Sequence, residues 1–298
     1  MIYKTILLNE VMDGWTQSDA TASVTLYLQE HSKEYEPDGC FPCVVVCPGG
    51  GYEFTSDREG EPVALRFAGK GYSAAVVKYS TNHRTFPTQL CELSMVVAWL
   101  RRNAKAFHLQ ANHIAVCGFS AGGHLAASLC NLYSLPLLRE QLPIAEDENR
   151  PDAALLCYPV ISSGEFAHVG SFENLCGDVV DAKMRALLSL ETSVHANCPP
   201  CFLWHTADDN AVPSENTLLY AMALRRYHIP LEMHIFLQGP HGLSLADCTT
   251  TNLAESKLPD VAKWFDWSVR FLDRICFLTT RIIRVFFDLP LDYFLLKR

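Results

Sequence analysis

Short apolar runs of strand length recur along this chain and alternate with segments of helical periodicity. The runs most typical of buried strands are residues 43–47, 73–79, 113–117, 153–158, 201–206 and 232–237. Helical patterns lie between them, at residues 62–68, 88–107, 121–133 and 214–227. Strands that are apolar on both faces and joined through helices are typical of a parallel sheet covered on both sides. The sequence therefore predicts an α/β fold with a mostly parallel, doubly wound sheet.

The beginning and the end of the chain differ from this pattern. Residues 24–29 alternate between apolar and polar side chains, which predicts an edge strand and antiparallel pairing before the parallel part. No repeat or low-complexity linker divides the rest, so we expect one domain over residues 1–274 and an apolar C-terminal extension over 275–298. Residues 162–197 are too long for an ordinary connection, which suggests an excursion over the functional site.

Composition limits the classes of partner. The formal net charge is −9 and the basic residues are scattered, so a nucleic acid partner is not expected. The apolar start of the chain is short and has no small-residue cleavage site, so we expect no signal peptide and a cytoplasmic protein. Arg281 and Arg284 interrupt the C-terminal extension, which predicts a packing, dimer or membrane-surface contact there rather than a transmembrane span.

The 12 cysteines suit buried reduced thiols better than a disulfide framework, because the cytosol keeps thiols reduced. The sequence contains two Cys-x-x-Cys pairs, and each pair leads into a predicted strand. They are Cys40 with Cys43 and Cys198 with Cys201. A redox pair normally uses a helix N-terminus to stabilise its thiolate. We therefore expect structural cysteines, no metal site and no cofactor.

Ser120 stands in a strand–turn–helix context. It occupies the centre of Gly-Phe-Ser-Ala-Gly at residues 118–122, directly after one predicted strand and before a predicted helix. A tight turn of this kind requires small neighbours and presents the serine hydroxyl at the positive end of the helix. Ser120 is therefore the predicted nucleophile.

A glycine-rich loop follows the predicted strand at residues 43–47. Backbone N–H groups can meet a developing oxyanion only where no side chain blocks their approach. Gly50 and Gly51 are the expected donors from this loop, with Ala121 N–H completing the hole. A phosphate-binding loop is the alternative, but the Gly-Lys-Ser/Thr ending and the Gly-x-Gly-x-x-Gly pattern are both absent.

A base and an acid should follow the serine, in the order serine, aspartate, histidine. Asp208 and Asp209 directly follow one predicted strand, and only one of them can serve as the acid. His241 lies in a turn after the last predicted strand and is the best base. His205 and His234 fall inside strand patterns and are interpreted as structural.

Several stretches resemble the bacterial acetyl-esterase and feruloyl-esterase-like α/β hydrolases. They are Pro48-Gly49-Gly50-Gly51-Tyr52, Gly118 to His124, Tyr158-Pro159-Val160, His205 to Asp209 with Val212-Pro213, and His241-Gly242. In that family two residues separate the acid from the Val-Pro pair, which implies Asp209. We also expect Tyr52 and His124, from the same stretches, to contact substrate. Pro48 replaces the histidine of the related lipase branch, which argues against a close lipase relationship.

The resemblance implies a serine carboxylesterase that acts on short acyl esters, such as acetyl groups on carbohydrates or plant-derived compounds, through Ser120, His241 and Asp209. Its substrate would be a small ester, with no metal or organic cofactor. Three alternatives stay open at this stage: a feruloyl esterase, a serine peptidase of the prolyl-oligopeptidase type, and an inactive hydrolase that acts as a binding protein.

Overall fold

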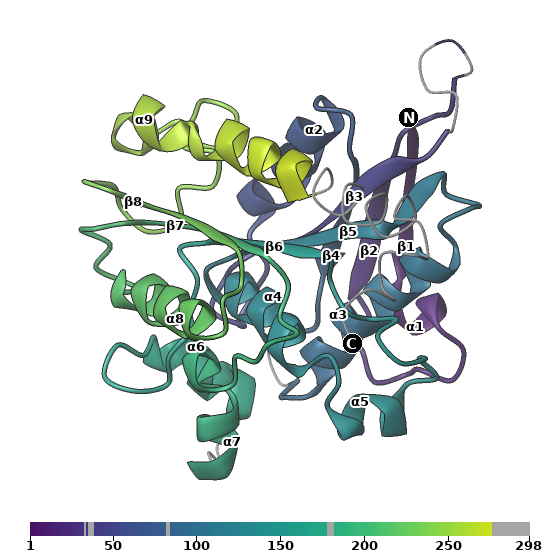
Figure 1. The fold of residues 1–298 in the computed structure, drawn as a ribbon, viewed down its shortest axis with the longest axis horizontal. Helices are drawn as coiled ribbons and strands as arrows, with labels where there is room; N and C mark the ends of the chain where they lie inside the picture. Colours follow the sequence, from purple (N-terminus) through teal and green to yellow (C-terminus); the bar gives the residue numbers. More distant parts are fainter. Residues whose placement is uncertain (33, 35–38, 82–83, 178–181, 276–298) are drawn as a thin grey trace, which may run out of the picture.

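The computed structural model describes residues 1–32, 34, 39–81, 84–177 and 182–275. These residues contain an eight-stranded sheet with the order β1-β2-β4-β3-β5-β6-β7-β8 (Figure 1). Strand β2 pairs antiparallel with β1 and β4, and every other neighbouring pair is parallel. The strands are β1 Ile2–Leu7, β2 Ser23–Leu28, β3 Phe41–Cys47, β4 Ser73–Lys78, β5 Leu109–Phe119, β6 Ala153–Cys157, β7 Cys201–Thr206 and β8 Leu231–Phe236. The predicted mostly parallel α/β sheet is confirmed.

Helices cover both faces of the sheet (Figure 1). Those described are α1 Leu8–Val11, α2 Glu61–Ala68, α3 Thr88–Arg102, α4 Ser120–Leu132, α5 Pro136–Gln141, α6 Val169–Cys176, α7 Ala182–Leu187, α8 Glu215–Arg226 and α9 Pro259–Ala262, with short 3₁₀ turns η1 Asp57–Glu59, η2 Leu190–Thr192 and η3 Ala254–Ser256. Strand β3 shows how the sheet divides the core. Val44 and Val46 pack with α2 and α9 on one face, whereas Val45 and Cys47 pack with α3 and α4 on the other.

The N-terminal strands differ from the prediction in their order within the sheet. The prediction that residues 24–29 form an edge strand is wrong, because β2 lies between β1 and β4. Strand β1 is the edge, and its side chains are almost all exposed. With so little burial, β1 carries no apolar period by which the sequence could reveal it.

The described C-terminal part of the chain ends in a helix. Residues 264–275 are helical, and Trp264 and Phe265 are buried against the sheet. The rest of the predicted extension, residues 276–298, lies outside the described residues, so its role stays a prediction. Within the described part of the chain, no helix is both long and apolar enough to cross a membrane.

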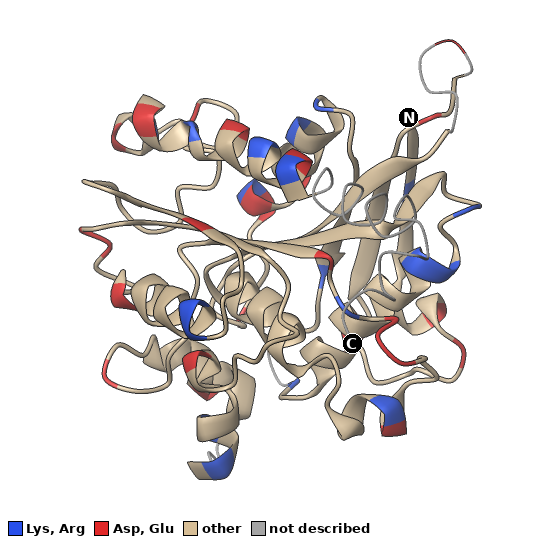
Figure 2. Ribbon diagram, viewed as in Figure 1, with Lys and Arg blue, Asp and Glu red and all other residues tan. Residues whose placement is uncertain are grey.

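Charged side chains are distributed around the sheet. Figure 2 shows Lys and Arg interspersed with Asp and Glu on the helices and loops, whereas the central strands carry few charges. Over the described residues, this distribution agrees with the scattered basic residues of the sequence.

Candidate active site

The turn between β5 and α4 presents Ser120. Its φ of 51° lies in the left-handed region, which a non-glycine residue adopts only where its surroundings impose it. A Cβ on Gly122 would lie 2.2 Å from the Cys47 carbonyl oxygen, and one on Gly118 would lie 2.2 Å from that of Gly122. The two glycines therefore let the start of α4 pack directly on the end of β3, which brings Ser120 beside the glycine-rich loop.

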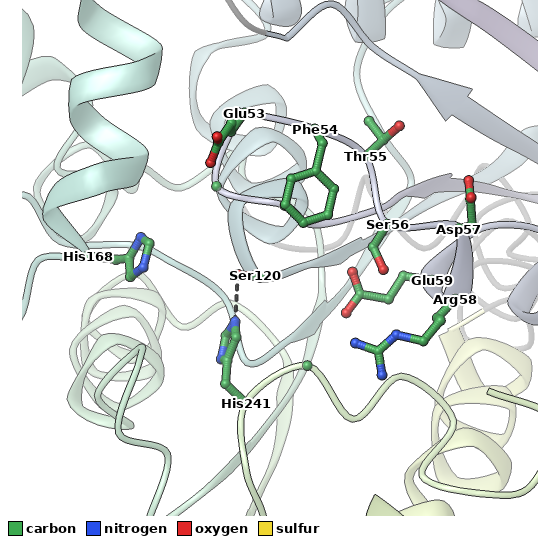
Figure 3. Close-up of a pocket in the computed structure, with 13 residues that line it drawn as sticks. Glu53, Phe54, Thr55, Ser56, Asp57, Arg58, Glu59, Ser120, His168 and His241 are labelled. Atoms are coloured by element: carbon green, nitrogen blue, oxygen red, sulfur yellow. Dashed lines mark hydrogen bonds between the residues drawn. The ribbon is translucent and has the colours of Figure 1, made fainter. Parts of the chain in front are cut away.

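Ser120, His241 and Asp209 form a hydrogen-bonded chain. His241 Nε2 lies 2.8 Å from Ser120 Oγ (Figure 3). On the other side of the ring, His241 Nδ1 lies 2.7 Å from Asp209 Oδ2. A carboxylate only accepts hydrogen bonds, so Nδ1 carries the proton and Nε2 accepts from the serine hydroxyl. This is the tautomer that a base for Ser120 requires.

The Asp209 carboxylate is held by several donors. Burial opposes its ionisation, but hydrogen bonds from His205 and His241, attraction to His241 and the Val212 N–H hold its pKa far below the usual range. Oδ1 accepts from the N–H groups of Ala211 and Val212, each at 3.0 Å. Asp209 is therefore a fixed anion at neutral pH.

Asp208 is not part of the hydrogen-bonded series formed by Ser120, His241 and Asp209. Its Oδ1 accepts from Gly239 N–H at 2.6 Å, which ties the end of β7 to the turn that carries His241. The two neighbouring carboxylates therefore have different partners, and only the Asp209 side chain bonds to His241.

The glycine-rich loop lies beside Ser120. A Cβ on Gly49 would come within 2.9 Å of Ser120 Cβ, so glycine is what allows this close approach. Gly50 has a φ of 129°, and a Cβ there would lie 2.2 Å from the Phe54 carbonyl oxygen. No described residue accepts a hydrogen bond from the N–H of Gly50 or Gly51, and Ala121 N–H belongs to the unpaired first turn of α4. These N–H groups are thus available to a ligand.

A cavity of about 560 Å³ opens over Ser120 and His241. Figure 3 shows the side chains of Glu53, Arg58 and His168 around it. Its lining residues are Gly50, Gly51, Glu53, Phe54, Thr55, Ser56, Asp57, Arg58, Glu59, Ser120, His168, His241 and Gly242. Most of these side chains are polar or charged.

Tyr52 and His124 do not lie on this cavity. Both are 1% exposed, and the Tyr52 hydroxyl donates to His124 Nδ1 at 2.8 Å. His124 Nε2 in turn donates to the Leu188 carbonyl at 2.9 Å, and Phe172 packs on the ring. The expected contact of these two side chains with substrate therefore finds no support, because helix α6 and the segment after α7 cover them.

Burial of His124 predicts a pH-dependent stability. Burial lowers its pKa to about 4 from the usual 6.5, so between these values the unfolded chain binds the extra proton and the folded chain does not. As pH falls from 6.5 to 4, the free energy of unfolding should decrease by about 3 kcal/mol more in the wild type than in His124→Gln. Urea unfolding at several pH values measures this difference.

His228→Asn is the matched control for that comparison. It removes an exposed histidine with a φ of 57°, a conformation that asparagine tolerates. Its curve should remain parallel to that of the wild type. Parallel curves for His124→Gln and the wild type would contradict a buried neutral His124.

The structure also brings to the site residues that were not among the predicted site residues. His168 reaches the cavity from the segment 162–197, which therefore approaches the site as expected. Burial, together with repulsion from His241, lowers the pKa of His168. His205 Nε2 lies 3.3 Å from Asp209 Oδ2, so this histidine supports the acid from inside β7. Glu59 lines the cavity although it is only 3% exposed. Isolated residues of this kind have no spacing pattern by which a sequence could reveal them.

The cysteines lie apart from this chemistry. All 11 that the structure describes are free thiols, and both Cys198 and Cys201 are buried. Burial raises the pKa of each of these two thiols. Among the described residues there is no group of three or more His, Cys, Asp or Glu arranged to hold a metal ion.

Comparisons with known proteins show which proteins this chain resembles. A family model described as BD-FAE matches residues 25–152. The acetyl ester-xyloside bifunctional hydrolase from Caldicellulosiruptor lactoaceticus has a similar structure, with a TM-score of 0.78 and 34% identity over 92% of this chain and 97% of its own.

Two curated relatives are longer than this chain. Endo-1,4-beta-xylanase B of Butyrivibrio fibrisolvens is 35% identical over 74% of this chain and 35% of its own length. The acetylxylan esterase of Xylanibacter ruminicola is 28% identical over 83% of this chain and 48% of its own length. The chain thus spans half or less of each of these two relatives.

Proposed function

This chain belongs to the esterases of the α/β-hydrolase family, and we propose that it hydrolyses short-chain carboxylic esters through Ser120, His241 and Asp209. The observation that carries the proposal is the continuous hydrogen-bonded chain from Asp209 through His241 to Ser120, which ends at a cavity open to a ligand. Serine, histidine and aspartate in this arrangement can activate a hydroxyl for acyl transfer.

In the proposed reaction, His241 Nε2 takes the Ser120 proton as Oγ attacks the ester carbonyl carbon. The oxyanion that forms is stabilised by the N–H groups of Gly50, Gly51 and Ala121. When it collapses, the bond to the alcohol oxygen breaks and His241 returns the proton to that oxygen. Water then repeats the sequence on the acyl-enzyme, releasing the acid and restoring Ser120.

For substrate, we propose an acetyl group on a carbohydrate or a related polar alcohol. The charged side chains of Glu53, Asp57 and Arg58 at the cavity favour a polar alcohol part over a long acyl chain. Relatives named acetylxylan esterase and acetyl ester-xyloside hydrolase support the same class.

A substrate panel tests this proposal. The value of kcat/KM should be highest for aryl acetate and fall by about 10-fold or more toward octanoate, since each methylene that finds no pocket forfeits binding. Acetylated xylo-oligosaccharides should release acetate. Preference for octanoate, for a feruloyl ester or for a prolyl anilide would replace the proposal by a lipase, feruloyl-esterase or peptidase activity, respectively.

The cellular setting is part of the proposal. We place the protein in the cytoplasm, because the described cysteines are free thiols and such thiols persist in a reducing compartment. A contact with a second copy or with a surface is assigned to residues 275–298, which are apolar apart from scattered charges.

A further inference from the structure

Glu59 lies beneath the glycine-rich loop with both carboxylate oxygens occupied. Its Oε2 accepts from Gly49 N–H at 2.7 Å, and its Oε1 accepts from the Tyr158 hydroxyl at 2.6 Å. A Cβ on Gly49 would lie 2.9 Å from both Glu59 Oε2 and Ser120 Cβ. Gly49 therefore lies directly between the Glu59 carboxylate and Ser120. The side chain is 3% exposed.

Tyr158 connects Glu59 to the loop that carries His241. Its ring packs edge-on against the His241 ring, with 5.1 Å between centroids. Its hydroxyl oxygen accepts from Ser244 N–H at 2.8 Å, three residues after His241 in the chain. Ser244 Oγ donates a hydrogen bond to the Arg58 carbonyl oxygen in the η1 turn, at 2.7 Å.

The hydrogen bonds around Glu59 fit an ionised carboxylate. Because Tyr158 accepts from the Ser244 N–H, its own O–H is free to donate to Glu59, and Gly49 N–H can only donate. In this arrangement Glu59 accepts at both oxygens, as an ionised carboxylate does and a primary amide cannot. Burial raises the pKa of Glu59, while the Tyr158 and Gly49 bonds and attraction to His241 and Arg58 oppose this rise.

We propose that Glu59 is a positioning residue for ester hydrolysis, which joins the oxyanion-hole loop at Gly49 to the base loop at His241 through Tyr158. Loss of the Gly49 bond would release the loop that presents Gly50 and Gly51, and loss of the Tyr158 bond would release the ring against which His241 packs. Both effects act on the transition state rather than on substrate binding. The inference rests on the function proposed above.

Glu59→Gln is the decisive variant. It keeps the shape of the side chain but places an NH₂ group against one of two donors, Gly49 N–H or Tyr158 O–H. We expect kcat for aryl acetate to fall by about 10- to 100-fold, with KM within about threefold of the wild type, as for partial loss of oxyanion donors. Unchanged kcat, or a loss confined to KM, would overturn the proposal.

A second variant makes the test independent of folding. Tyr158→Phe removes one donor, so glutamine at position 59 can then turn its oxygen to Gly49 and its NH₂ to the vacated space. The double variant should therefore be no slower than Glu59→Gln alone, whereas independent roles would multiply the two losses. Should Glu59→Gln not fold, Tyr158→Phe decides alone: an unchanged kcat overturns the proposal.

Tyr27→Phe is the matched control, because Tyr27 donates to Glu61 at 2.9 Å in another tyrosine–glutamate pair outside the cavity. It should leave kcat unchanged, and thermal unfolding of every variant verifies the fold. The proposed function itself is tested by the wild type and Ser120→Ala. An active wild type, an inactive Ser120→Ala and a fully active Glu59→Gln would overturn the role of Glu59 alone.

Discussion

Ser120→Ala is expected to lower kcat for aryl acetate by about 10⁴-fold or more, because it removes the atom that we propose forms the acyl-enzyme. The backbone should be undisturbed, since alanine meets the φ of 51° with the same Cβ that serine has. A stopped assay with purified protein and thermal unfolding curves measure both effects. Reaction with a serine-directed phosphonate should label the wild type and leave the variant unlabelled.

Ser128→Ala is the matched control for that variant. Ser128 is 3% exposed and belongs to the same helix α4, but it does not line the cavity. It should retain wild-type kcat. Full ester hydrolysis by Ser120→Ala, or phosphonate labelling of a different residue, would refute Ser120 as the nucleophile.

Asp209→Asn should lower kcat by about 10³- to 10⁴-fold. The Ala211 and Val212 N–H groups already point at Oδ1, so asparagine would place its oxygen there and its NH₂ against His241 Nδ1. His241 would then carry its proton on Nε2, facing Ser120, and could not accept the serine proton. The kcat of the purified variant over pH 5 to 9 measures the loss.

Asp208→Asn is the control for this second result, because the two aspartates are neighbours in the chain. Its oxygen can still accept from Gly239 N–H, so kcat should stay within about fivefold of the wild type, as expected for an ordinary neutral hydrogen bond. If Asp208→Asn were the inactive variant instead, Asp208 and not Asp209 would be the acid that orients His241.

Much of the fold could be predicted because its information is local. The apolar runs of β3 and β5 and the small residues around Ser120 are contiguous in the chain, and each specifies its own backbone conformation. Strand β1 escaped prediction because its side chains are mostly exposed, and an exposed strand needs no apolar pattern. The bounds of α3 and β5 also differ from the expected ones by several residues, since helix ends depend on the loops that follow.

The site itself shows where local information ends. Tyr52 and His124 stand beside the oxyanion loop and the nucleophile in the sequence, yet Phe172 and Leu188, from distant segments, bury them. Glu59 has no neighbours that mark it, and its partner Tyr158 is 99 residues away. Contacts of this kind arise only when loops from separate strand ends meet at one edge of the sheet.

The sequence alone determined the turn that presents Ser120 and the glycine-rich loop beside it, because a tight strand-to-helix turn and a close backbone approach demand small residues at adjacent positions. Which of two neighbouring aspartates faces His241, which aromatic residues are buried and how Glu59 links two loops were decided only by the tertiary structure. Successive side chains in a loop point in different directions. Their partners are set by the packing of strands that the sequence places far apart.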